Sequence, residues 1–290
     1  MINPTLTGDS AGGEWTTTLR PVSGWFDIHL AELWRYRDLI ALFVKRDFVA
    51  VYRQTVLGPL WYLIQPLLTT LVFTIIFGQV AKISTDGLPQ ILFYLSGFVA
   101  WRYFSDCLTK TSNTFVGNAH LFGKVYFPRL TVPISVVLSN LIAFVIQVAL
   151  FLCFWGYFAV KDADIHFKPL LILLPLIVLQ MAFLGLGCGI IISSLTTKYR
   201  DLAQLVGFGT QLWMYATPVV YPMSIVPKKW YWLMALNPMA PLIEFFRYTF
   251  LGVGEVNALN LLVSFIMTLL ILALGIVLFS RIEKSFMDTV

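Results

Sequence analysis

The sequence predicts an all-α integral membrane protein with six transmembrane helices, an N-terminal amphipathic interface helix and a re-entrant helix pair before the last span. Three observations support this fold class. Of the 290 residues, 58% are hydrophobic. Only 12% are charged, about half the fraction found in a soluble domain. Long charge-free stretches also recur along the chain, and about 20 apolar residues are enough to cross a bilayer.

The N-terminal part precedes the first span. Residues 1–25 are polar and are expected to form a loosely ordered tail. They contain no apolar stretch of the kind found in a cleavable signal peptide, so we expect the first span to direct insertion. Residues 26–53 predict a cytoplasmic amphipathic helix with one apolar side: Leu33, Tyr36, Ile40, Phe43, Val44, Phe48 and Val51. Such a helix can lie at the membrane interface or pack on its own protein, and the two arrangements are compatible.

Residues 54–282 predict the transmembrane domain. Its spans are expected at residues 58–80, 90–108, 131–159, 170–195, 202–222 and 257–280. Gly58 and Pro59 mark the turn from the interface helix into the first span, and Pro66 is expected to kink that span. In the second span Arg102 and Asp106 are four residues apart, so they can pair on one helix face.

Three further segments have distinct patterns. Gly185, Gly187 and Gly189 in the fourth span predict close approach of neighbouring helices, because small residues allow backbones to come together. The polar stretch 109–130 is too long for a tight turn. Residues 230–243 are apolar but only 14 residues long, and Asn237, Pro238 and Pro241 interrupt them. Residues 224–250 therefore predict two short re-entrant or interfacial helices. Residues 283–290 are expected to form a short C-terminal tail.

The distribution of basic residues predicts the orientation. Six spans place both termini on the same side of the membrane. With the N-terminus inside, most of the 20 Lys and Arg residues fall in inner segments, as the positive-inside rule requires. We therefore expect both termini to be cytoplasmic. The net charge of +5 is too small, and too closely tied to the spans, to indicate a nucleic-acid partner.

Several functions are disfavoured by the residues. The segment 117–124 resembles a phosphate-binding loop, but five residues separate its glycines and Val125 stands where Ser or Thr is required. The chain is therefore expected to have no ATPase activity and to bind no cofactor. The three histidines are far apart in sequence, so no metal site is expected. Asp162, Asp164 and His166 share a loop and are read as solvated charges, so no catalytic residue is assigned.

Aromatic residues make up 16% of the chain, and two interpretations remain open for them. Aromatic belts at the two membrane interfaces account for many such residues. Some could instead line a conduit and stack on the faces of sugar rings. The candidates for this second role are Trp61, Tyr62, Trp101, Tyr103, Trp213 and Tyr215.

Three segments together resemble a known family. They are RDLIALFVKRDFVAVYRQTVLGPLWYLIQP (37–66), FGKVYFPRLTVP (122–133) and LNPMAPLIEFFRYTFLG (236–252). In this order they are similar to permease subunits of type 2 ABC exporters. The resemblance covers roughly residues 30–282 and is greatest to the branch that exports lipid-linked polysaccharide such as O-antigen, capsule or teichoic acid.

The resemblance implies a homodimer bound to two copies of a separate cytoplasmic ATPase, with the pore between the protomers. Residues 109–130 would be the coupling loop that docks on the ATPase, through Thr114, Phe115, Asn118, His120 and Lys124. Residues 224–250 would be the gate helices, with Trp230, Asn237, Glu244 and Arg247. The cargo would be a polysaccharide linked to undecaprenyl pyrophosphate.

A basic inner entrance would attract the pyrophosphate, and Arg46 and Arg53 are candidates for it. For either arginine taken alone, the positive-inside bias is the better explanation. We therefore expect a permease subunit of an ATP-driven exporter of lipid-linked polysaccharide, preferably O-antigen, in the bacterial inner membrane. An exporter of small amphiphiles or drugs and an ion-coupled carrier are the alternatives. The absence of acidic residues and histidine at mid-depth in the charge-free spans disfavours the carrier.

Overall fold

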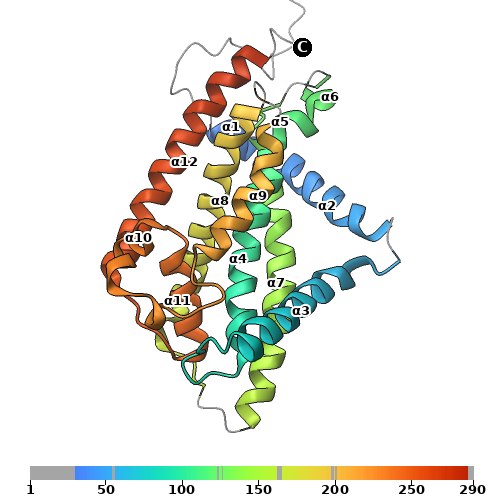
Figure 1. The fold of residues 1–290 in the computed structure, drawn as a ribbon. Helices are drawn as coiled ribbons and strands as arrows, with labels where there is room; N and C mark the ends of the chain where they lie inside the picture. The colour runs from blue at the N-terminus through green and yellow to red at the C-terminus, as the bar shows by residue number, and fades with distance from the viewer. Residues whose placement is uncertain are drawn as a thin grey trace, which may run out of the picture.

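The computed structural model describes residues 30–53, 56–122, 124–125, 127–161, 165–196, 199 and 201–286. These residues form helices and connecting loops, and they contain no β-strand (Figure 1). The predicted all-α class is therefore confirmed. The predicted N-terminal tail and the last four residues of the C-terminal tail lie outside the described part of the chain.

The helices follow one another along the whole described chain. In order they are α1 (Leu30–Arg35), α2 (Arg37–Arg53), η1 (Gly58–Leu60), α3 (Trp61–Phe73), η2 (Thr74–Val80), α4 (Gln90–Ser112), α5 (Thr114–Gly117), α6 (Ala119–Phe122), α7 (Thr131–Val160), η3 (Pro169–Leu173), α8 (Leu174–Thr196), α9 (Leu202–Tyr215), η4 (Met223–Ile225), η5 (Lys228–Trp230), α10 (Tyr231–Leu236), α11 (Ala240–Leu251) and α12 (Ala258–Phe286).

Helices α4 and α8 form the centre of the bundle. Helix α8 packs along α4 on one side and along α12 on the other, and α4 also contacts α3, α7, α9 and α11 (Figure 1). Most residues of α4 are buried, including Phe93, Tyr94 and Phe104. A helix enclosed by other helices does not need an apolar surface, and this explains how α4 can carry Arg102 and Asp106.

The glycines of α8 make this close packing possible, as the sequence predicts. A methyl group added at Gly185 would lie 2.7 Å from the Cβ atom of Cys107, and one at Gly189 would lie 2.6 Å from the Cβ atom of Thr111, both in α4. On another side of α8, a methyl group at Gly187 would lie 2.9 Å from the backbone of Leu272 in α12. Only hydrogen fits at these three positions.

Four helical segments are long and apolar enough to cross a membrane, judged on the described residues. They are Gly58–Val80, Thr131–Val160, Pro169–Thr196 and Ala258–Ile282, and they match four of the predicted spans. The second predicted span is the polar but enclosed helix α4, which continues to Ser112 and so takes the first residues of the predicted coupling loop.

The fifth predicted span is shorter than expected. Helix α9 ends at Tyr215 rather than at residue 222, and residues 216–219 form turns. Pro218 explains this end, because a proline disfavours helical geometry in the residue before it. The 14 residues of α9 are about 21 Å long at 1.5 Å per residue. This is less than the thickness of about 30 Å of a bilayer core.

The predicted interface helix is divided in two. Residues 26–29 lie outside the described part, and a turn at Tyr36 separates α1 from α2. Helix α2 packs on α7, with Phe43 6% exposed. The chain then turns at Gly58, whose φ of 47° is in the left-handed region that glycine adopts without strain. The joint predicted at Gly58 and Pro59 is therefore confirmed.

Some of the short helices lie together at one end of the bundle. Helices α1, α5 and α6 lie at the end where α12 finishes, while α3 and α11 lie toward the other end (Figure 1). Two of the segments that the sequence assigns to the cytoplasm, α1 and the short helices α5 and α6, thus lie at the same end of the molecule (Figure 1).

Candidate functional site

The aromatic residues proposed for a conduit fall into two groups. Trp61 in α3 and Tyr215 in α9 are 47% and 43% exposed, and Tyr62 and Trp213 are partly buried. Trp101 and Tyr103 in α4 are each only 3% exposed. The ring of Trp101 lies 6.1 Å from that of Trp213, and the ring of Tyr103 lies 4.9 Å from that of Phe144. Trp101 and Tyr103 therefore pack inside the helix bundle. Trp61 and Tyr215 are exposed and available to a ligand.

Exposed amides accompany these aromatic residues, and sequence reasoning missed them. Gln204, Phe208, Gln211 and Tyr215 recur at helical spacing on one face of α9, and all four are exposed. Gln65 is exposed on α3. An amide facing lipid would leave its hydrogen bonds unmade, at a cost of several kcal/mol. The face of α9 therefore fits contact with water, a polar ligand or protein rather than acyl chains.

An ion pair extends this polar surface between α3 and α4. Arg102 donates from Nε to Asp106 Oδ2 at 2.9 Å, and this confirms the predicted pair. Its Nη2 atom donates to Gln65 Oε1 at 3.1 Å. One arginine thus connects the two helices. The sequence contained one signal for this contact between α3 and α4: Gln65 is a polar residue inside a charge-free span.

The short helices after α4 are anchored to the bundle. Phe115 is fully buried, and its ring stacks on that of Phe279 of α12 at 4.5 Å. Its backbone N–H donates to Ser193 Oγ of α8 at 3.2 Å. Thr114 is also buried, with a hydroxyl that donates to Thr111 O at 2.7 Å. These two of the five predicted coupling residues hold the segment in place and face inward.

The other predicted coupling residues lie nearer the surface. Lys124 is exposed, as are Val116 and Val125. Asn118 is partly buried, and its amide donates to Thr114 O at 3.0 Å. The side chain of His120 lies outside the described part. The surface that this segment offers to a partner is therefore apolar with one described lysine.

Of the two arginines proposed for a pyrophosphate entrance, one is described. Arg46 bonds to its neighbour Asp47, with Nη2 and Oδ1 2.8 Å apart, and its guanidinium lies 4.8 Å from the centroid of the Phe43 ring. The side chain of Arg53 lies outside the described part. An anion at Arg46 would have to compete with Asp47.

The gate helices contain a buried charge pair. Arg247 of α11 is 2% exposed and donates from Nη1 to Glu244 Oε1 at 3.2 Å. Its Nη2 donates to the carbonyl of Val219 at 3.1 Å, and its guanidinium lies 3.8 Å from the centroid of the Phe93 ring. A single side chain therefore connects α11 to α4 and to the turn after α9. A methyl group at Gly97 would lie 2.8 Å from Arg247 Nη2, so glycine makes room for it.

Burial acts against both charges of this pair. It raises the pKa of Glu244 and lowers the pKa of Arg247. The charge of each residue shifts the pKa of the other in the opposite direction, and Asp86 adds to the rise at Glu244. Each charge thus depends on its partner, as expected for an ion pair removed from water.

Asn237 holds the break between the two gate helices. Its Oδ1 accepts hydrogen bonds from Trp213 Nε1 at 3.0 Å and from the N–H of Met239 at 3.1 Å. Its Nδ2 donates to Thr217 Oγ1 at 2.8 Å. The predicted break at Asn237 is confirmed, since α10 ends at Leu236 and α11 begins at Ala240. Trp230 is 46% exposed before α10.

Comparison with known proteins gives a consistent result. The family model described as ABC-2 type transporter matches residues 38–251. An O-antigen export system permease protein RfbA from Klebsiella pneumoniae is 26% identical over 251 residues, which is 87% of this chain and 94% of the relative. The protein of that name from Myxococcus xanthus is 31% identical over 221 residues, 76% and 82% of the two chains. The polysialic acid transport protein KpsM of Escherichia coli is 22% identical over 239 residues, 80% and 89%.

Proposed function

Because this chain belongs to the ABC-2 type transporter family, we propose that it is the membrane permease through which a separate ATPase exports a lipid-linked polysaccharide, namely O-antigen. The observation that carries the proposal is the similarity to O-antigen export permeases, at 25–31% identity over most of the chain. Capsule export is the second candidate, supported by capsule relatives of lower identity.

The polar face of α9 supports a glycan as the cargo. A sugar ring presents hydroxyl groups at its edge and C–H groups on its faces. The exposed amides of Gln204 and Gln211 can bond to hydroxyls, and the exposed rings of Phe208 and Tyr215 can stack on C–H faces. A carrier of small amphiphiles would need an apolar pocket instead. Trp61 and Tyr62 of α3 are proposed to extend the same path.

In a dimer, the polar face of α9 would line the path of the glycan. We assign the conduit to the space between two copies of the chain, with α3, α4 and α9 of each copy facing it. The polar face of α9 is then removed from lipid, where its amides would be unsatisfied. In this arrangement α4 and the region of α9 complete six crossings, and both termini lie in the cytoplasm of the bacterial inner membrane.

The coupling loop would transmit the work of the ATPase. Two ATPase copies would dock on Lys124 and the apolar residues beside it, with Asn118 and His120 near the contact. Phe115 connects this segment to α8 and α12. A displacement of the loop would therefore be transmitted to two membrane helices. We propose that Arg46 and Arg53 form the entrance for the pyrophosphate. The gate helices would form the exit for the polysaccharide.

Complementation tests this function. A bacterial strain whose own O-antigen permease gene is deleted would receive the chain with its partner ATPase. We expect O-antigen on the cell surface and no accumulation of undecaprenyl-linked polymer inside. If the chain and its ATPase are stably produced, accumulation with no surface polymer would refute the O-antigen assignment. Restored capsule in a capsule-permease deletion strain would then support the second candidate.

A further inference from the structure

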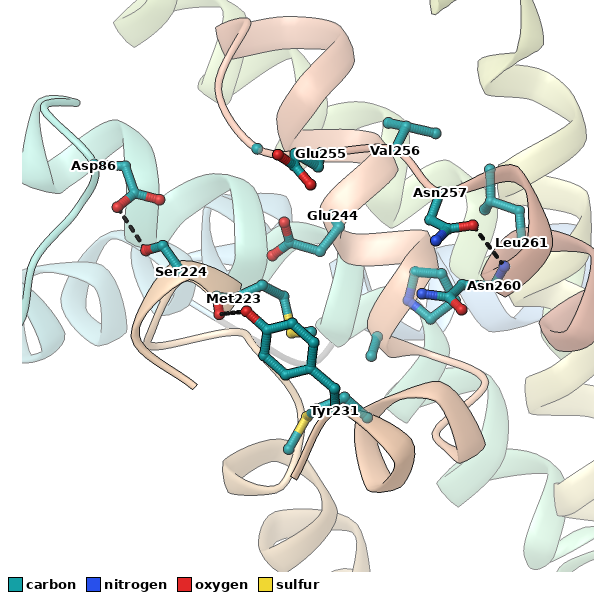
Figure 2. A pocket seen from close by; sticks show the side chains of 14 residues that line it. Asp86, Met223, Ser224, Tyr231, Glu244, Glu255, Val256, Asn257, Asn260 and Leu261 are labelled. Carbon is teal, nitrogen blue, oxygen red and sulfur yellow. Dashed lines mark hydrogen bonds between the residues drawn. The ribbon is translucent and has the colours of Figure 1, made fainter. Parts of the chain in front are cut away.

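A cavity of about 320 Å³ lies between the gate helices and the start of α12 (Figure 2). This volume is at the lower end of the range of about 300–1,000 Å³ for small-molecule sites. Part of its wall is apolar and includes Met234, Pro241 and Leu261. The polar groups around it come from five separate segments: Asp86, Ser224, Tyr231, Glu244, and the stretch that contains Glu255, Asn257 and Asn260. The Ser224 hydroxyl donates to Asp86 Oδ1 at 2.7 Å.

Several of these polar groups are available for a ligand. Glu244 is 8% exposed, and its carboxylate points into the cavity (Figure 2). Its Oε1 accepts from Arg247, whereas its Oε2 has no hydrogen-bond donor within the described part of the chain. Asn257 accepts from the backbone N–H of Leu259 at 2.9 Å, so its side-chain nitrogen is left as a donor.

The combination of groups fits a carbohydrate. Each sugar hydroxyl both donates and accepts hydrogen bonds, and here carboxylate acceptors stand opposite amide donors. The Tyr231 ring and the apolar wall can contact the C–H face of a sugar. A metal ion fits less well, since the described residues contain no group of three or more His, Cys, Asp or Glu side chains arranged to hold one.

The charges around the cavity predict which sugars it accepts. Asp86, Glu244 and Glu255 are acidic, and the lining residues, all within the described ranges, include no lysine or arginine. Arg247 lies behind Glu244 and is already bonded to it. A carboxylated sugar would therefore meet like charges at short range, which is unfavourable in a partly buried site.

We propose that this cavity is a saccharide subsite on the gate helices that holds about one or two uncharged sugar rings of the polymer and rejects acidic ones. The inference rests on the proposed function and adds a specificity to it. It assigns to the gate helices direct contact with the cargo, with Tyr231 and Asn260 as binding residues and Glu255 as a residue that excludes anions.

Ligand-detected NMR of the complete permease–ATPase complex in nanodiscs tests the subsite. The probes are two trisaccharides, neutral maltotriose and acidic trigalacturonic acid, in which every ring carries a carboxylate. We expect saturation transfer to maltotriose only. The double variant Tyr231→Ala/Asn260→Ala should weaken maltotriose binding about tenfold, by loss of one ring contact and one hydrogen bond. Tyr157→Ala is the control, because Tyr157 is 54% exposed on α7 and does not line the cavity.

A second variant tests the charge argument independently. Glu255 is exposed, so Glu255→Lys should fold normally and should gain binding of trigalacturonic acid. Equal binding of both trisaccharides by the wild type, or unchanged binding by the double variant, would overturn the subsite. The subsite and the proposed function can be refuted separately. A wild-type protein that exports O-antigen but binds no maltotriose refutes only the subsite, whereas absence of export refutes the proposed function.

Discussion

Arg247→Met should lower the free energy of unfolding by about 3–5 kcal/mol, the cost of breaking a buried ion pair by removing one partner. Methionine preserves much of the apolar stem but removes the guanidinium. Glu244, with a side chain only 11% exposed, would lose its partner at 3.2 Å. The fully buried Val219 would also lose the donor to its carbonyl. The Val219 carbonyl would then remain buried without a donor, and the Glu244 carboxylate would keep its charge in a largely buried position without its counter-ion.

The double variant Glu244→Met/Arg247→Met separates these two contributions. It removes both charges, so the part of the loss that comes from an unpaired carboxylate should be recovered. A deficit of about 1–3 kcal/mol should remain, because the Val219 carbonyl is still buried without a donor. The coupling between the two positions follows from the double-mutant cycle.

An exposed ion pair provides the matched control. Arg37 Nε lies 3.9 Å from Asp38 Oδ1, and the two side chains are 64% and 96% exposed. Arg37→Met should therefore change the stability by less than about 1 kcal/mol. The assay is unfolding of the purified protein in mixed micelles with increasing SDS, followed by tryptophan fluorescence. If Arg247→Met were as stable as Arg37→Met, a structural role for the buried pair would be refuted.

Three other predictions concern packing, coupling and the conduit. Gly189→Ala should be less stable than Gly156→Ala by about 1–3 kcal/mol in the same assay. The alanine methyl would lie 2.6 Å from Thr111 at position 189, whereas it would meet nothing within 4 Å at position 156. Equal stabilities of the two variants would contradict close α4–α8 packing. Lys124→Glu should lower export per ATP hydrolysed while Lys161→Glu does not, and full export by the Lys124 variant would argue against docking at this loop. Replacing Trp61, Tyr62 and Tyr215 together by leucine should slow polymer export measured by pulse labelling, whereas a wild-type rate would assign them to the aromatic belt.

Helix positions were predictable wherever a long apolar run determines the structure. Helix α7 was expected at 131–159 and occupies Thr131–Val160, because the bilayer thickness sets the length of such a run. The fifth span was overestimated, since composition alone does not weigh the effect of Pro218 against apolar residues on both sides of it. The segment predicted to couple to an ATPase forms short helices, and its inward and outward residues could not be separated from the sequence, because helices this short have no reliable periodicity.

The candidate site was predictable only in part. The spacing of Arg102 and Asp106 indicated an ion pair within one helix, and the pair forms. The hydrogen bond from Arg102 to Gln65 joins residues 37 positions apart. No local sequence pattern indicates a contact between residues so far apart. The polar face of α9 was visible in the sequence as glutamines inside an apolar run, but its meaning depends on which side of the helix other helices cover.

The sequence by itself determined that this chain is a helical membrane protein, where its long apolar helices lie and which family it resembles. The first two properties follow from hydrophobic run length and local spacing, and the resemblance rests on the three segments 37–66, 122–133 and 236–252 taken together. Only the tertiary structure decided that Arg247 joins α11 to α4, that Phe115 anchors the short helices after α4 and that a polar cavity lies beside Glu244. Each depends on residues far apart in sequence, and those residues meet because helix packing buries them together.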